Sequence, residues 1–89
     1  LELDLSGNSV GEIGAGVICA AMASNTSLTK VQLSNNPLRG AGADHVADML
    51  RKNTSIATLG MGSCGLTDKC TQSLSDALCS NVHLTELDV

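Results

Sequence analysis

The sequence predicts an α/β fold in which short parallel strands alternate with helices in stacked repeats. Three observations lead to this prediction. Leu28, Ile56 and Leu84 occupy equivalent positions at a constant separation of 28 residues, without insertion or deletion. The residues that follow each of them alternate between apolar and polar, which is typical of a strand. The second half of each unit places apolar residues at helical spacing, as one buried face of a helix requires.

The strands are predicted where two apolar residues flank a single outward-facing residue. The pattern occurs four times, at Leu3 and Leu5, Val31 and Leu33, Leu59 and Met61, and Leu87 and Val89. A strand this short buries its apolar side only when neighbouring units stack beside it. We therefore expect successive units to form a short parallel sheet.

The helices are predicted in the second half of each unit. In the first two helices the buried face is expected at Ala15, Ile18, Met22, Ala43, Val46 and Leu50. Gly11–Glu12 and Thr67–Asp68 are the predicted starting points, and the second is the stronger because Thr is a preferred N-cap residue. Each helix is predicted to end at an asparagine, which tolerates the left-handed conformation common at helix ends: Asn25, Asn53 and Asn81.

Two segments, LTKVQLSNNPL (28–38) and IATLGMGSCGL (56–66), resemble the leucine-rich repeat L-x-x-L-x-L-x-x-N/C-x-L, with Ile, Val and Met accepted for Leu. The 28-residue step, the glycines Gly14 and Gly42, and the junctions SNTSL and KNTSI are similar to the ribonuclease-inhibitor-like subclass. This resemblance implies a leucine-rich-repeat solenoid, a right-handed βα superhelix with its short parallel sheet on the concave side and its helices on the convex side. Cys70 stands where Gly14 and Gly42 stand, so a locally different turn is expected there.

The chain, residues 1–89, is predicted to be one segment of about three repeats. Their bounds are 1–27, 28–55 and 56–83, with the start of a further repeat at 84–89. Both ends carry apolar strand residues instead of the polar caps that close a solenoid. We therefore expect neighbouring repeats of the same parent chain at both ends, in a longer array.

Composition and charge argue against several classes of partner. The net charge is −4 and only five residues are Lys or Arg, so no basic stripe is available for nucleic acid or an anionic membrane. The longest apolar or small run, 14–23, is shorter than the roughly 20 residues that a helix needs to cross a bilayer. The chain has no Phe, Trp or Tyr, which predicts a thin core of aliphatic residues, Met and Cys.

No catalytic, metal or cofactor site is predicted. Cys19, Cys64, Cys70 and Cys79 occupy different phases of the repeat and are interpreted as free thiols in a reducing, cytoplasmic compartment. The spacing from Cys70 through Cys79 to His83 matches no common zinc pattern. No cysteine is expected within hydrogen-bond reach of a histidine, and the stretch SGNSVGEIGAG lacks the residues of a phosphate-binding loop. The sequence therefore predicts a protein that is not an enzyme.

A buried loop position is shared by Asn8, Asn36 and Cys64. The resemblance implies that these side chains form a structural ladder, bonding neighbouring backbone groups along the stack. Because an unpaired buried backbone group is costly, we expect the ladder to stabilise the array.

The outward side of the strands is the predicted protein-binding surface, because solenoids of this kind use their concave face for partners. Its residues are Glu2, Asp4, Ser6, Lys30, Gln32, Ser34, Thr58, Gly60, Gly62, Glu86 and Asp88. Gly60 and Gly62 have no side chains to project, so a shallow notch is expected at their row.

These features predict a protein–protein interaction scaffold within a larger intracellular protein, binding partners mainly through the concave face. The resemblance leaves two alternatives open. One is a regulatory domain, such as a Ran-type GTPase activator or the sensor region of a nucleotide-binding innate immune receptor. The other is a structural component of a cytoskeletal or ciliary assembly. The fold does not select among them.

Overall fold

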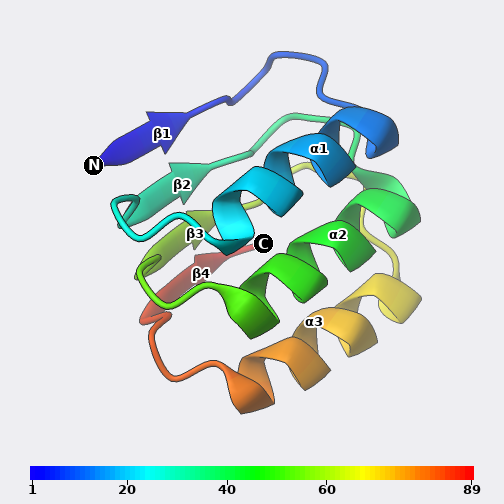
Figure 1. The fold of residues 1–89 in the computed structure, drawn as a ribbon. Helices are drawn as coiled ribbons and strands as arrows, with labels where there is room; N and C mark the ends of the chain where they lie inside the picture. Colours follow the sequence, from blue (N-terminus) through cyan, green and yellow to red (C-terminus); the bar gives the residue numbers. More distant parts are fainter.

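The chain forms two layers, a four-stranded parallel sheet and a row of three helices (Figure 1). The computed structural model describes all of residues 1–89. The elements are β1 (Glu2–Asp4), α1 (Glu12–Ala23), β2 (Lys30–Gln32), α2 (Arg39–Lys52), β3 (Thr58–Gly60), α3 (Asp68–Ser80) and β4 (Glu86–Asp88). The predicted α/β repeat fold is confirmed.

Register in the sheet follows the 28-residue step predicted from the sequence. Strands pair in the order β1-β2-β3-β4, and Leu3, Val31, Leu59 and Leu87 stand side by side. Val31 and Leu59, in the two central strands, are fully buried, whereas Leu3 and Leu87 at the sheet edges are half-buried. Stacking of units is thus what removes each strand's apolar side from water.

The core lies between the two layers and contains no aromatic side chain. Its large, fully buried members include Leu33, Leu38, Leu50, Ile56 and Met61. In α1 the buried residues are Ala15, Cys19 and Met22, so Ile18, predicted to be buried, is only half-buried. Its counterpart Val46 in α2 is fully buried, because α2 has a helix on both sides and α1 on one side only.

The helices start where predicted. The left-handed conformation predicted for the asparagines at the helix ends is wrong. α1 begins after Gly11 and α3 after Thr67, although the Thr67 hydroxyl makes no capping bond and lies 3.2 Å from the Cys70 Sγ. Asn53 and Asn81 are extended, with φ of −71° and −97°. Neither residue adopts the left-handed conformation, because its side-chain oxygen accepts hydrogen bonds from the backbone amides two and three residues later, as described below.

Left-handed residues occur in the loops that follow the strands. Asn35 and Ser63 share one loop position and have φ of 60° and 57°. Two residues further on, Ser9 is left-handed at 56°, but the same position in the second repeat is Pro37, whose ring fixes a negative φ. There the left-handed turn moves to Arg39, at φ 56°.

The position shared by Gly14, Gly42 and Cys70 leaves a different amount of space for a side chain in each unit. A β-carbon at Gly42 would lie 2.8 Å from the Leu38 Cβ, too close for any side chain. At Gly14 the nearest atom would be the Val10 Cγ1 at 3.5 Å, an ordinary contact. Cys70 is accommodated and buried in α3. Only the second repeat, with its altered turn at Arg39, therefore demands glycine here.

None of the helices combines the length and the apolar character that crossing a membrane would take.

Candidate functional site

All eleven residues of the predicted binding surface lie in or directly after the strands. Parallel register places Glu2, Lys30, Thr58 and Glu86 in one row across the sheet. The next row contains Asp4, Gln32, Gly60 and Asp88. Ser6, Ser34 and Gly62 follow two residues later in their units. We call this set the concave surface.

Charge on the concave surface is arranged around one lysine. Glu2, Asp4, Glu86 and Asp88 are exposed on the two outer strands, and Lys30 is half-buried on β2. Hydrogen bonds from the side chain and the backbone of Ser6, followed by the charge of Lys30, hold the pKa of Asp4 below its usual range. The Ser6 amide donates to Asp4 Oδ1 at 2.9 Å. The surface therefore presents carboxylates on both outer strands, with Lys30 between them.

The shallow notch predicted at Gly60 and Gly62 is absent at Gly60. Gly60 is buried, and a β-carbon there would collide with the Gln32 side-chain oxygen, so Gln32 lies across the position that the glycine leaves open. Beside it, the Gly62 amide donates to the Ser34 hydroxyl at 3.1 Å. Side chains of the second repeat, Gln32 in β2 and Ser34 in the loop after it, thus cover the centre of the sheet.

Two shallow hollows flank Lys30 and Gln32 in place of the predicted notch. One, of about 380 Å³, is lined by Glu2, Leu3, Asp4, Ser6, Lys30 and Gln32. The other, of about 530 Å³, is lined by Lys30, Gln32, Thr58, Leu59, Thr85, Glu86, Leu87 and Asp88. Lys30 lines both hollows, and each also has two carboxylate residues in its lining, which suits a partner that inserts cationic or hydrogen-bonding side chains.

Asn36 bonds the backbone of its own unit and of the preceding one, as predicted for a ladder residue. Its amide nitrogen donates to the carbonyls of Leu5 and Leu33, each at 2.9 Å. Its side-chain oxygen accepts from the amides of Asn8 and Val10, at 3.0 and 2.9 Å. The side chain is buried and has no unpaired polar atom. It therefore ties the first repeat to the second.

The other two predicted ladder residues behave differently from each other. The Cys64 thiol is buried and donates to the Leu33 carbonyl at 3.1 Å, which repeats the role of Asn36 one unit later. Asn8 was expected to be buried and is exposed. Its side chain bonds only the Ser6 carbonyl of its own loop, because β1 is the edge of the sheet and no unit lies beyond it in the structure.

A second asparagine ladder runs along the junctions between helix and strand. Asn53 donates to the carbonyls of Met22 and Asn25, and it accepts from the amides of Ser55 and Ile56 at 2.8 and 2.7 Å. The same position in the next unit, Asn81, donates to the Leu50 carbonyl at 2.7 Å. The sequence signals this ladder by an asparagine at the same position of every unit, Asn25, Asn53 and Asn81, but that pattern alone predicts a helix terminator.

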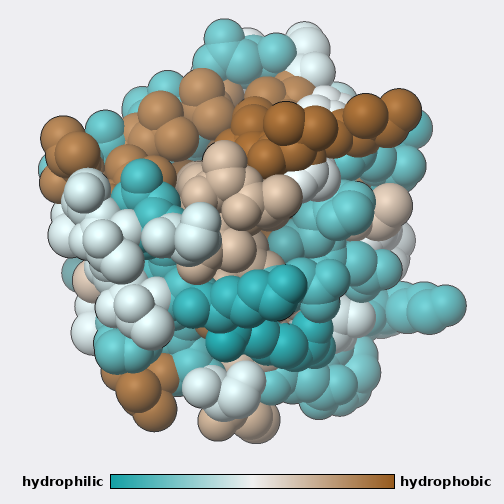
Figure 2. Space-filling model, in the orientation of Figure 1, coloured by the Kyte–Doolittle hydropathy of each residue, from teal (hydrophilic) through white to brown (hydrophobic).

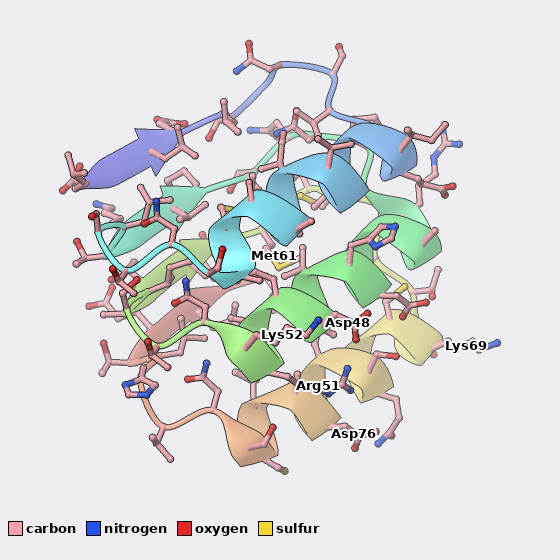
Figure 3. All side chains as sticks on the ribbon, viewed as in Figure 1. Asp48, Arg51, Lys52, Met61, Lys69 and Asp76 are labelled. Carbon is pink, nitrogen blue, oxygen red and sulfur yellow. The ribbon has the colours of Figure 1, made fainter.

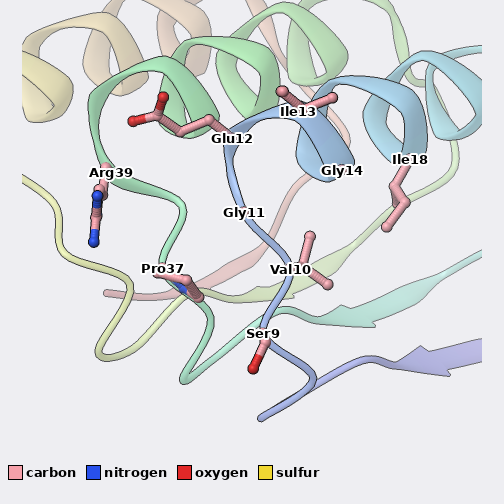
Figure 4. Close-up of a pocket in the computed structure, with 9 residues that line it drawn as sticks. All are labelled: Ser9, Val10, Gly11, Glu12, Ile13, Gly14, Ile18, Pro37 and Arg39. Carbon is pink, nitrogen blue, oxygen red and sulfur yellow. The ribbon is translucent and has the colours of Figure 1, made fainter.

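The largest hollow lies at the start of α1 (Figure 4) and has a volume of about 630 Å³. Its lining comprises Ser9, Val10, Gly11, Glu12, Ile13, Gly14, Ile18, Pro37 and Arg39. The two charged side chains, Glu12 and Arg39, form no salt bridge. No group of three or more His, Cys, Asp or Glu side chains is placed to hold a metal ion.

Comparison with known proteins agrees with this architecture. Residues 24–47 match the family described as Leucine Rich repeat. The human NACHT, LRR and PYD domains-containing protein 13 is 31% identical over 88 residues, which cover 99% of this chain and 8% of that protein. Mouse ribonuclease inhibitor is 32% identical over 72 residues, covering 80% of this chain and 16% of the inhibitor.

A solved structure gives the same result in three dimensions. The chain described as leiomodin-1 actin-binding site 2 superposes with a TM-score of 0.91 at 26% identity. The match covers 97% of this chain and 50% of that one. This chain spans less than a fifth of the length of the two relatives named above. With the fold, the register and the relatives in agreement, the 89 residues are a leucine-rich-repeat region of the ribonuclease-inhibitor-like subclass.

Proposed function

We propose that this repeat region is a protein–protein interaction module whose concave surface binds a basic segment of a partner protein. The observation that supports the proposal most strongly is the arrangement of charge. Four exposed carboxylates border the surface on β1 and β4, and the single lysine lies between them. A partner with cationic side chains spaced to reach both borders would pair with Glu2, Asp4, Glu86 and Asp88 and avoid Lys30.

The chemistry of the surface supports recognition without catalysis. Its polar groups are carboxylates, hydroxyls, one amide and one ammonium, and none is paired as nucleophile and base. The surface has no aromatic residue and no Arg, which are the side chains that usually dominate binding energy. We therefore expect electrostatic complementarity to set the choice of partner and the rate of association more than a few dominant contacts.

A charge exchange within the concave surface tests the proposal. The variant with Asp4→Lys and Lys30→Glu keeps the net charge at −4 while reversing the local pattern. Partner proteins captured from cell extract by the full chain are compared between this variant and the wild type. We expect the variant to lose partners that the wild type retains, and we expect that binding to weaken with rising salt.

The matched control exchanges charges on the helix layer instead. Lys69→Glu with Asp76→Lys also preserves the net charge and alters two exposed side chains of α3 (Figure 3). It should capture the same partners as the wild type. If the α3 variant loses the partners and the concave variant keeps them, binding occurs through the helices and the proposal is wrong.

The two alternatives for the parent protein each have support from a relative. Likeness to a protein with NACHT, LRR and PYD domains favours a repeat region that regulates or senses within a larger receptor. Likeness to an actin-binding site of leiomodin-1 favours a cytoskeletal role. Binding of purified actin filaments by the full chain separates them, because co-sedimentation is expected only for the second.

The proposal includes two properties of the parent protein. The repeats at 1–27, 28–55 and 56–83 are inferred to be part of a longer array, which would extend the concave surface. A cytoplasmic location is supported by the four free thiols, since reducing compartments keep cysteines unpaired.

A further inference from the structure

The outer side of α1 is apolar, unlike the outer sides of α2 and α3. Ile13 is 87% exposed and Val17 is 69% exposed, and Ala20 is exposed one turn later. We call these three residues the α1 stripe. Figure 2 shows a brown band over α1 and a largely teal surface over α2 below it. An exposed apolar patch bordered by polar side chains is typical of a contact surface.

Stacking of repeats does not explain the exposure of the stripe. The 28-residue step places Ala41 and His45 of α2 at the positions of Ile13 and Val17. α2 packs between α1 and α3, yet Ala41 and His45 are not among the core residues that this packing buries. Side chains at these positions lie on the outer side of the helix layer. A further repeat beside α1 would therefore leave the stripe largely uncovered.

A hollow of about 150 Å³ lies next to the stripe, between α1 and α2. Its α1 wall consists of Gly16, Cys19, Ala20 and Ala23, and its α2 wall of His45, Asp48, Met49 and Lys52. The α1 wall is small and largely apolar, so it admits a protruding aliphatic side chain. The same face of the molecule thus carries projecting aliphatic side chains and a hollow beside them, and a two-fold symmetric contact between identical chains places both on one surface.

The order of charges along α2 selects the direction of such a contact. Asp44 and Asp48 lie before Lys52, which is in the last turn, and all three are exposed. Figure 3 shows Asp48 and Lys52 on the side of the helix layer that faces the viewer, below α1. Antiparallel apposition brings Asp44 of one copy toward Lys52 of the other. It also brings the two Asp48 side chains together, but each is paired with Arg51 of its own chain at 2.8 Å. Parallel apposition instead opposes each of these charged residues with its own copy. With the 28-residue step between α1 and α2, the antiparallel register carries Val17 of one copy toward Ala23 of the other, at the edge of the hollow.

We propose that the helix layer is an antiparallel contact between two copies of this chain, in which Val17 of each copy enters the hollow between α1 and α2 of the other and Ile13 packs beside it. The carboxylates and the lysine of α2 border the contact and fix its direction. The concave surfaces then face outward from the pair, free to bind partners.

Sedimentation equilibrium of the full chain, from micromolar to millimolar concentration, tests the contact. We expect a reversible dimer whose Kd rises by about tenfold or more in Val17→Lys, equivalent to about 1.4 kcal/mol per factor of ten. Val82→Lys is the matched control, because Val82 is 84% exposed and lies in the junction before β4, outside the helix layer. It should leave the Kd unchanged. Both valines are exposed, so both variants should keep the far-ultraviolet circular dichroism of the wild type.

A charge exchange tests the antiparallel direction. Lys52→Glu alone should weaken the dimer, because the introduced carboxylate would then oppose Asp44 of the other copy. Adding Asp44→Lys should restore the wild-type Kd. A chain that remains monomeric at every concentration overturns the proposal and leaves the stripe to a different partner. Association that survives Val17→Lys also overturns it and indicates contact through the ends of the array instead.

Discussion

Single polar side chains hold neighbouring units together in this chain. Asn36 makes bonds to four backbone groups at 3.0 Å or less, drawn from its own unit and the preceding one. Asn53, at the junction after α2, also bonds four backbone groups at 3.0 Å or less, drawn from the preceding unit, its own unit and the first residue of the next. Both are buried without an unpaired polar atom. Each amide therefore replaces the water that would otherwise have to satisfy turns inside the stack.

Asn36→Leu is expected to lower the free energy of unfolding by about 3 kcal/mol, since each backbone group left unpaired costs roughly 1–3 kcal/mol. Urea denaturation followed by circular dichroism measures the change. The control is Asn8→Leu at the equivalent exposed position, where a loss within about 0.5 kcal/mol is expected. If the two variants lose equal free energy of unfolding, the loss comes from placing Leu in this loop and not from the missing ladder bonds.

The role of a residue was predictable from the sequence where its position recurs in the repeat and the structure holds a preceding unit for its side chain to bond. The shared position of Asn36 and Cys64 predicted a buried ladder, and both side chains form it. Asn8 carries the same residue type, but its strand, β1, lies at the edge of the sheet in this structure, so its side chain has no preceding unit here to bond. Asn53 was misinterpreted because asparagine serves both as a left-handed terminator and as a bonding side chain, and sequence does not separate the two.

Among the elements, the strands were predicted to within a residue because their apolar side is buried by identical neighbours. The interior of the loops was less predictable. Pro37 cannot adopt the conformation that Ser9 and Gly65 share, so the left-handed residue shifts to Arg39. The Gln32 side chain covers Gly60, which depends on a rotamer choice across two strands. Both differences arise from contacts between units and not from the repeat pattern itself.

Helix α2 gives an element-level prediction through its glycine. Gly42→Ala should destabilise the chain by about 1–3 kcal/mol, because the new β-carbon would meet the Leu38 Cβ at 2.8 Å within a packed core. Gly14→Ala, at the same position of α1, has its nearest contact at 3.5 Å. It should stabilise α1 by about 0.5–1 kcal/mol, the gain expected when glycine is replaced in a helix.

Thermal and urea unfolding of the two glycine variants should therefore move in opposite directions. A loss of stability in both variants would mean that the space around the β-carbon does not decide which residue fits this position, including Cys70 in the third repeat. A gain in both would mean that Leu38 moves away at little cost.

For the molecule as a whole, stability is expected to fall in alkaline solution. Burial raises the pKa of the Cys19 thiol from 9.0 to about 11. The folded state therefore holds this proton more tightly than the unfolded state does. Its contribution is complete below pH 9.0 and is lost as the pH rises toward about 11. Urea denaturation from about pH 8 to about pH 11 measures the loss.

Cys19→Ala is the control for this pH dependence, because the equivalent residue of the next unit, Ala47, is itself buried. The variant should show a shallower decline over the same range. Parallel curves for variant and wild type would contradict the assignment to Cys19.

The direction of the two ladders has a consequence for how such a chain lengthens. Asn36, Asn53 and Asn81 each donate to a carbonyl 31 residues earlier, in the preceding unit. Every unit thus brings the donor that its predecessor needs and offers the acceptor that its successor uses. A gene segment encoding one unit, copied in tandem, would add a unit whose bonds are already matched on both sides. Array length is then free to change by the gain or loss of whole units, and evolution need only adjust the side chains that each copy displays.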